Sequence, residues 1–120
     1  MLPLVFPLLS GAAAVTALIG TTPVRAYRHG SAPQGVTAPY VTWSAPGGFA
    51  ENTLGAADAD VFRVQVDCWS DIDTQVETLA AAVRAAIEPA ANLIAYVADE
   101  QDPVTKRYRI SFTFDFITPR

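Results

Sequence analysis

The sequence predicts an α+β domain in which an antiparallel sheet of about four strands carries two helices packed on one face. Residues 61–69 alternate between apolar and polar side chains, which is the period of two expected of a half-buried strand. Residues 72–87 repeat apolar side chains along one stripe of a helix. Residues 106–118 alternate again, with aromatic and aliphatic side chains on one face and polar ones on the other.

Length and charge limit the possible classes. The 120 residues are enough for one ordinary core, so we expect a single domain over residues 1–120. The net charge is −4, and the eight basic residues form no long run, which argues against a general nucleic-acid-binding surface. One cysteine cannot form an internal disulfide and fits a reducing compartment.

The N-terminal apolar segment predicts a helix over residues 6–18 that ends at Gly20. A signal peptide is the alternative, but no Lys or Arg precedes the apolar run, and Pro3 and Pro7 interrupt it. The run is also too short to span a membrane. The residues expected to face the sheet are Leu8 or Leu9, Ala12, Val15, and Leu18 or Ile19.

The next part of the chain contains two expected strands and a long loop. Residues 24–27 suggest a short edge strand, and residues 40–44 have the β-branched and aromatic composition of a strand. Residues 46–60 show no secondary-structure period, so we expect a long loop there. Because Phe49 and Leu54 are large and apolar, the loop either folds back as a lid on its own sheet or becomes ordered on a partner.

The central strand leads directly into the main helix. Its apolar face is formed by Phe62, Val64, Val66 and Cys68. The hydroxyl of Ser70 is the expected N-cap, and Pro89 supplies the stop. The buried stripe of the helix is expected to comprise Ile72, Val76, Leu79, Val83 and Ile87.

Two more strands complete the sheet. Residues 93–98 can form a strand, and residues 99–105 a polar turn. Basic residues concentrate at the start of the last strand, a pattern typical of a solvated edge; they are Lys106, Arg107 and Arg109. The apolar face of this strand is formed by Tyr108, Ile110, Phe112, Phe114 and Phe116.

The residues give no support for catalysis. His29 lies in a Pro/Gly-rich connector without a second histidine, and Cys68 lies on an apolar strand face. Asp99, Glu100 and Asp102 lack the glycine and distal glutamate of an EF-hand. We therefore expect no catalytic residue, no metal, no cofactor and no enzyme activity.

Several short motifs, taken in order, resemble the tail completion or tail terminator family of long-tailed bacteriophages. They comprise Leu18-Ile19-Gly20 after a short helix, then Ala32-Pro33-Gln34-Gly35, then Ala38-Pro39-Tyr40-Val41, and finally Val64-Gln65-Val66-Asp67-Cys68-Trp69 before an Ala-rich helix. The resemblance covers nearly the whole chain. The chain departs from the family in its proline-interrupted start and in residues 47–60.

The resemblance implies a structural virion protein that caps the head-proximal end of the tail tube as a ring, usually hexameric. Such a ring ends tube growth and joins the tail to the head connector. The implied partners are further copies of the chain, the tail tube protein and the connector protein, with DNA only passing through the lumen and no membrane. The implied location is the virion tail, assembled in the host cytoplasm, in a phage or a phage-derived particle.

If the chain forms a ring, its charge distribution and its large apolar side chains suggest interface residues. Acidic residues near the helix start and basic residues on the last strand are complementary patches that neighbouring copies can bring together; the acidic residues can alternatively face the lumen and repel DNA. Trp69 is expected at a helix or subunit boundary. The full set of subunit or tube interface candidates is Phe49, Leu54, Trp69, Asp71, Asp73, Arg107 and Arg109.

Two other classes remain open. A different head-to-tail connector or minor structural subunit shares the same assembly logic. A small enzyme or ligand-binding domain requires a pocket with convergent polar groups, against which the lone histidine and cysteine argue.

Overall fold

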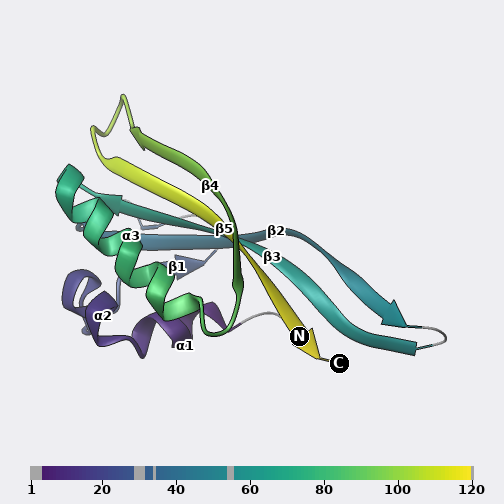
Figure 1. The fold of residues 1–120 in the computed structure, drawn as a ribbon. Helices are drawn as coiled ribbons and strands as arrows, with labels where there is room; N and C mark the ends of the chain where they lie inside the picture. The colour runs from purple at the N-terminus through teal and green to yellow at the C-terminus, as the bar shows by residue number, and fades with distance from the viewer. Residues whose placement is uncertain (1–3, 29–31, 34, 54–55, 120) are drawn as a thin grey trace.

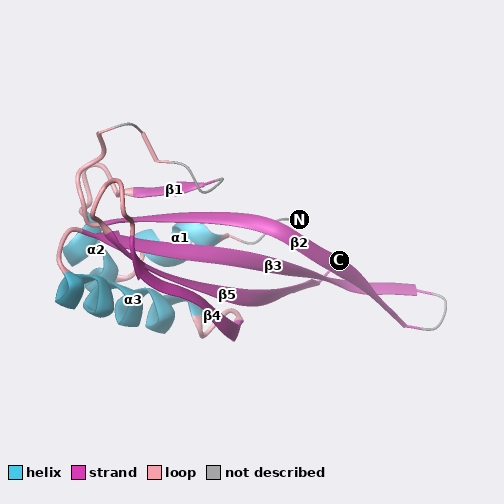
Figure 2. Cartoon of the chain, turned by 90° about the horizontal axis from the view of Figure 1, so that it is seen from above, coloured by secondary structure: helices cyan, strands magenta, loops and turns pink. Residues whose placement is uncertain are grey.

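The structure is a computed structural model that describes residues 4–28, 32–33, 35–53 and 56–119, with backbone only for residues 46–53, 56–60 and 118–119. Its helices are Val5–Ser10 (α1), Ala13–Ile19 (α2) and Asp73–Ile87 (α3). Its strands are Ala26–Arg28 (β1), Tyr40–Thr53 (β2), Ala56–Ser70 (β3), Asn92–Gln101 (β4) and Tyr108–Pro119 (β5). The helices lie together on one face of the sheet (Figures 1 and 2).

The sheet has the strand order β1-β2-β3-β5-β4. All pairs are antiparallel except β1 with β2, which run parallel. The α+β class with helices on one face is confirmed. The expected set of about four antiparallel strands and two helices is wrong in detail, because the described residues form a mixed sheet of five strands and three helices.

The core lies between the helices and the covered face of the sheet. Phe112 and Phe114 of β5 are fully buried at its centre, with their rings 5.2 Å apart. The covered side of β3 is apolar as predicted, and Cys68 belongs to it; burial raises the pKa of its thiol and leaves the group unreactive. From α3 the core receives Val76, Leu79, Ala80, Val83 and Ile87.

The N-terminal segment forms two helices instead of one. Gly11 and Ala12 separate them, and the backbone of Ala12 is extended. Glycine is a poor helix former, so the chain can turn here and bring both Leu9 and Val15 to full burial. The predicted end at Gly20 is confirmed: its φ of 85° is a left-handed conformation that favours glycine.

Helix α3 begins later than predicted. Ser70 belongs to β3, and the N-cap position is Ile72, which has extended backbone and is exposed instead of buried. The hydroxyl of Ser70 still organises the start, because it accepts from the backbone N–H of Ile72 at 3.1 Å and donates to Gln75 Oε1 at 2.6 Å. The helix ends just before Pro89 as predicted.

Residues 46–60 were expected to form a loop, and this prediction is wrong for the backbone. β2 continues to Thr53 and pairs with β3 from Ala56 onward. The register shifts twice, between Ser44 and Gly47 and between Glu51 and Asn52, so the period of two is lost although the backbone ladder continues. Leu54 lies outside the described residues.

The hairpin of β2 and β3 extends well beyond the helices and gives the molecule an elongated shape (Figure 1). The molecule measures 51 by 28 by 24 Å. Beyond the helical layer, the hairpin is supported on one side by β5, which pairs with β3 as far as Ala59. The hairpin is therefore an arm that projects from a compact body.

Candidate assembly surface

The face of the sheet opposite the helices, here called the open face, carries an aromatic and cationic cluster. Tyr40 and Trp69 are direct partners across β2 and β3, and their rings stack with centroids 5.8 Å apart. The guanidinium of Arg109 lies over Trp69 at 5.6 Å, and that of Arg107 lies over Tyr40 at 5.4 Å. Trp69 Nε1 also donates to the hydroxyl of Thr42 at 3.2 Å. Stacked rings with cations above them make a rigid surface.

Carboxylates neutralise both arginines of this cluster. Arg109 contacts Glu100 at 2.6 Å and Asp67 at 3.7 Å. Arg107 reaches Asp71 at 3.3 Å and also donates to the carbonyl of Val36 at 2.9 Å. Both guanidinium groups are therefore already paired with carboxylates, which disfavours binding of a nucleic-acid phosphate to this cluster.

A third ion-paired arginine lies further along the open face. Arg63 of β3 and Asp115 of β5 are cross-strand partners with a bidentate contact at 2.9 and 3.0 Å. Hydrogen bonding to the Arg63 guanidinium lowers the pKa of Asp115 below its ordinary value. Together the ion-paired groups of the open face comprise Arg63, Arg107 and Arg109 against Asp67, Asp71, Glu100 and Asp115, which is close to charge balance.

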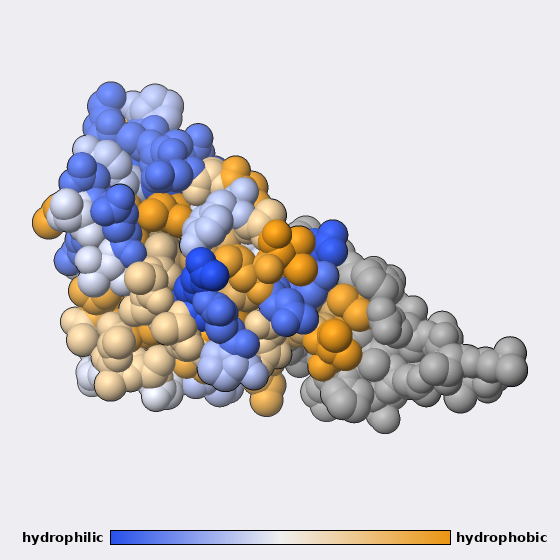
Figure 3. All heavy atoms as spheres, viewed as in Figure 1, coloured by the Kyte–Doolittle hydropathy of each residue, from blue (hydrophilic) through white to orange (hydrophobic). Residues whose placement is uncertain are grey.

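Strand β4 forms one edge of the sheet and exposes apolar side chains. No described residue pairs with its outer edge. Tyr96 is 59% exposed and Val97 54% exposed, and Ile94 is also exposed. Apolar side chains lie open near the middle of the view in Figure 3, between the hydrophilic turn that follows β4 and the hairpin arm. An edge of this kind is a template for another strand.

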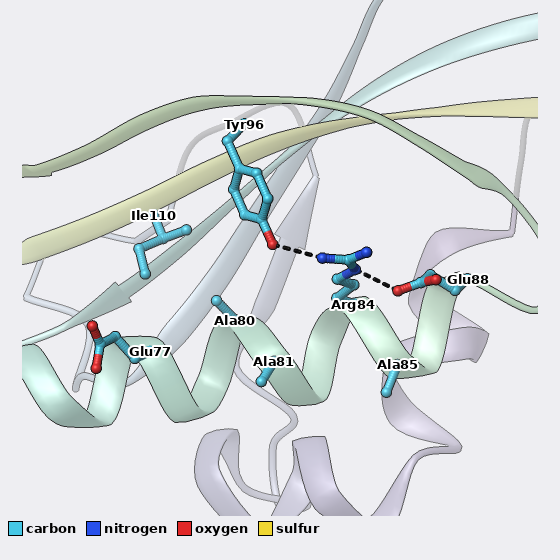
Figure 4. Close-up of a pocket in the computed structure, with 8 residues that line it drawn as sticks. All are labelled: Glu77, Ala80, Ala81, Arg84, Ala85, Glu88, Tyr96 and Ile110. Atoms are coloured by element: carbon cyan, nitrogen blue, oxygen red, sulfur yellow. Dashed lines mark hydrogen bonds and ion pairs between the residues drawn. The ribbon is translucent and has the colours of Figure 1, made fainter.

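A shallow groove of about 310 Å³ lies between α3 and β4 (Figure 4). Its floor is mainly small and apolar, with Ala80 and Ala81 from α3 and Ile110 from β5. Arg84 crosses one end of the groove, donates to the hydroxyl of Tyr96 at 3.0 Å and pairs with Glu88. The charges at that end satisfy each other, so the groove offers few convergent polar groups to a small ligand.

Most of the predicted interface residues come together on the open face. Trp69, Arg107 and Arg109 belong to one cluster, and Asp71 joins it through its pair with Arg107. The acidic helix start and the basic strand therefore already meet within one chain. Arg107 and Arg109 do not lie on an edge as their charge suggested, because β5 runs between β3 and β4.

The other candidates lie elsewhere. Asp73 is exposed at the start of α3, where it accepts from the backbone N–H of Thr74 at 2.7 Å. Phe49 lies in the hairpin arm, where the structure describes only the backbone, and Leu54 is outside the described residues. Trp69 was expected at a helix or a subunit boundary. It packs on the face away from the helices, so the helix alternative is excluded and the subunit boundary stays a prediction.

Sequence reasoning missed two partners. Tyr40 was assigned to a strand, but only its register with Trp69 reveals the stack. Glu100 was assigned to a turn, yet β4 continues through it and places it opposite Arg109. The alternation of polar residues on β5 could have suggested a charged partner strand.

Among the residues that the structure describes, no group of three His, Cys, Asp or Glu could hold a metal ion. No described helix is long and apolar enough to cross a bilayer.

An elongated sheet domain with an aromatic and ion-paired open face and an unpaired edge strand that exposes apolar side chains has the build of a structural assembly subunit. The family model of "Tail completion protein gp17" matches residues 3–119. The chain belongs to this family and is thus a tail structural protein of phage-like virions.

Among solved structures, the fold is similar to a chain of the "Virion of native gene transfer agent (GTA) particle". The TM-score is 0.71 at 19% identity, and the match covers 97% of this chain and 92% of that chain. This likeness shows the shared fold. No curated protein matches the sequence.

Proposed function

We propose that the protein forms a ring that caps the head-proximal end of the tail tube, ends tube growth and joins the tail to the head connector. The observation that carries this proposal is that one sheet has two unlike edges available. The described residues leave β4 unpaired on its outer side, and they leave β2 unpaired on its outer side beyond Trp43. A contact between unlike surfaces repeats from copy to copy and closes into a ring when the rotation allows.

The partners follow from the same arrangement. Further copies of the chain occupy the edges, and we take the copy number as six from the family resemblance. The tail tube protein and the connector protein bind the two ends of the ring. DNA passes through the lumen without binding, because the charges of the open face are paired and nearly balanced.

The test is self-association of the purified protein. We expect closed rings in negatively stained micrographs and a matching mass by light scattering. Val97→Lys puts a charge on the exposed β4 edge and should shift the protein to monomers. Val104→Lys is the matched control, because Val104 is 87% exposed in the turn after β4 and its replacement should leave rings intact.

A second readout belongs to the particle. Particles assembled without this protein should carry tails of irregular length or tails that fail to join heads, and the Val97→Lys protein should not restore them. A parent protein that stays monomeric at every concentration and is dispensable for tail length would contradict the proposal.

A further inference from the structure

We propose that neighbouring copies join by pairing β4 of one copy with β2 of the next, so that the sheets form one continuous barrel with the open faces inside. This inference rests on the proposed ring and specifies the contact that closes it. The partner at the outer edge of β4 is a second copy of this chain.

The two free edges match in length and direction. β4 has ten residues, Asn92–Gln101, and residues 44–53 of β2 form an equally long stretch that no described residue pairs on its outer side. β2 is antiparallel to β3, β3 to β5, and β5 to β4. β4 and β2 therefore run in opposite directions, and the new contact continues the antiparallel alternation of the sheet.

The edges can meet only with a stagger, because β1 already occupies Val41 to Trp43 of β2. Followed across the sheet, the middle of β4 lies level with residues 66–67 of β3, whereas the middle of the free β2 stretch lies level with residues 61–62. Each copy is thus displaced along the strands by about five residues, or about 17 Å at the usual rise per residue.

This stagger is the amount that a closed barrel needs. The four strands β2, β3, β5 and β4 are about 19 Å wide at the usual strand spacing. A displacement of about 17 Å over that width tilts the strands by about 40°, which falls within the 35–45° found in barrels. A flat continuation of the sheet gives no tilt and cannot close.

The direction of the stagger places the helices outside. Seen from the helical side with the hairpin arm upward, β4 lies to the left and β1 to the right (Figures 1 and 2). In this view the copy on the right is displaced upward. Around a closed ring, this displacement makes the strands slant. The slant has the sense that right-handed strand twist gives to a barrel seen from outside, so the helical side is the outer side. The charge-balanced open face therefore lines the lumen.

Charge at the junction is complementary. The nearest register that puts paired side chains on the same face of the sheet places Glu100 of one copy opposite Ser44 of the next, a displacement of five residues along β4 and four along β3. This contact lies where β1 ends with the exposed Arg28. The C-terminal part of β4 and the following turn are acidic, with Asp99, Glu100 and Asp102. The basic end of β1 thus faces an acidic stretch of its neighbour.

Paired cysteines test the register. Glu100→Cys combined with Ser44→Cys should give disulfide-linked ladders that end at the full ring on non-reducing gels. Ser44→Cys combined with Ala95→Cys is the matched control, because Ala95 lies level with Ser44 across the sheet and meets it only in a flat, unstaggered contact. A disulfide requires Cα atoms within about 7 Å. Because Ala95 and Glu100 are five residues apart along β4, Ser44→Cys can cross-link to only one of them in a given arrangement. Buried Cys68 does not interfere.

Hydrogen exchange gives a second measurement on the unsubstituted protein. Amides of residues 44–53 and 92–101 should become protected together when monomers form rings. Rings in which only the control pair cross-links, or in which these amides stay unprotected, would overturn the staggered pairing and leave the ring itself standing. Absence of any rings would overturn the ring proposal as well.

Discussion

Trp69 is the residue that organises the open face. Its indole contacts Tyr40, Arg109 and Thr42, and these three residues come from two different strands on either side of it. A single large side chain thereby connects β2, β3 and β5 on the face that the helices do not cover. Its loss should be felt in the stability of the subunit before any effect on assembly.

We expect Trp69→Ala to lower the free energy of unfolding by about 2 kcal/mol, at the low end for a large aromatic because the indole is only half-buried. Trp69→Phe should lose less, about 1 kcal/mol, since it keeps a ring over Tyr40 and loses the hydrogen bond to Thr42. Urea unfolding measures both. Identical midpoints for the parent and the alanine variant would refute this role.

Asp115 gives stability a dependence on pH. Because Arg63 lowers its pKa in the folded state, the pair stabilises the fold above the ordinary carboxyl pKa of 3.8, and this contribution disappears as pH falls through the lower folded value. Asp115→Asn should therefore be less stable than the parent at pH 7, and the difference should shrink below about pH 4. Asp99→Asn removes an exposed carboxylate with the same change in charge and should show little difference at either pH. A gap between parent and Asp115→Asn that is constant from pH 7 to pH 3 would argue against the pair.

At the scale of the elements, the end of α2 and the start of β1 form one clamp. Arg25 donates from Nε to the carbonyl of Pro39 at 2.9 Å and from Nη2 to the carbonyl of Leu18 at 3.0 Å. This side chain ties the helix end to the segment that enters β2. The Arg25 guanidinium can lie this close to the backbone of Gly20 because Gly20 has no Cβ.

Gly20→Ala should destabilise the protein by more than 1 kcal/mol, because the left-handed φ is strained for alanine and the new Cβ would lie 2.9 Å from Arg25 Nη1. Gly35→Ala separates the two causes. Gly35 also has a left-handed φ, of 76°, but a Cβ there meets nothing within 4 Å. In thermal unfolding the parent should be the most stable, Gly35→Ala the next and Gly20→Ala the least stable. Equal losses of stability for the two variants would show that the conflict with Arg25 does not contribute.

The hairpin arm matters at the scale of the whole molecule. The arm projects beyond the helices, and its backbone does not fold back on the sheet as a lid (Figure 1). In the proposed ring the arm can reach a neighbouring copy or the tail tube. We therefore retain Phe49 and Leu54 as proposed contacts of the assembled tail.

Replacing both Phe49 and Leu54 with serine should leave the free energy of unfolding of the isolated subunit within about 0.5 kcal/mol of the parent. The same variant should fail to form rings or should give overlong tails, as seen by electron microscopy of particles. Val104→Ser is the control for a loss of exposed apolar surface elsewhere. Normal tails from the double variant would exclude these two positions as contacts.

The sequence by itself determined the layered build of the protein. The alternation in β3 and β5 and the stripe of α3, apart from the exposed Ile72, specify which side chains are buried, because strand and helix periods depend on local geometry alone. The motif order also identified the tail completion family, which the family match confirms. The apolar faces of both strands were predicted residue by residue.

Only the tertiary structure decided the edges and the partners. The arm was missed because its backbone hydrogen bonds form across register shifts that erase the side-chain period. The stack of Trp69 on Tyr40, the pair of Arg107 with Asp71 and the internal position of β5 all depend on strand order and register. Local propensity contains no information on these, because they are set by which strands, distant in sequence, lie side by side.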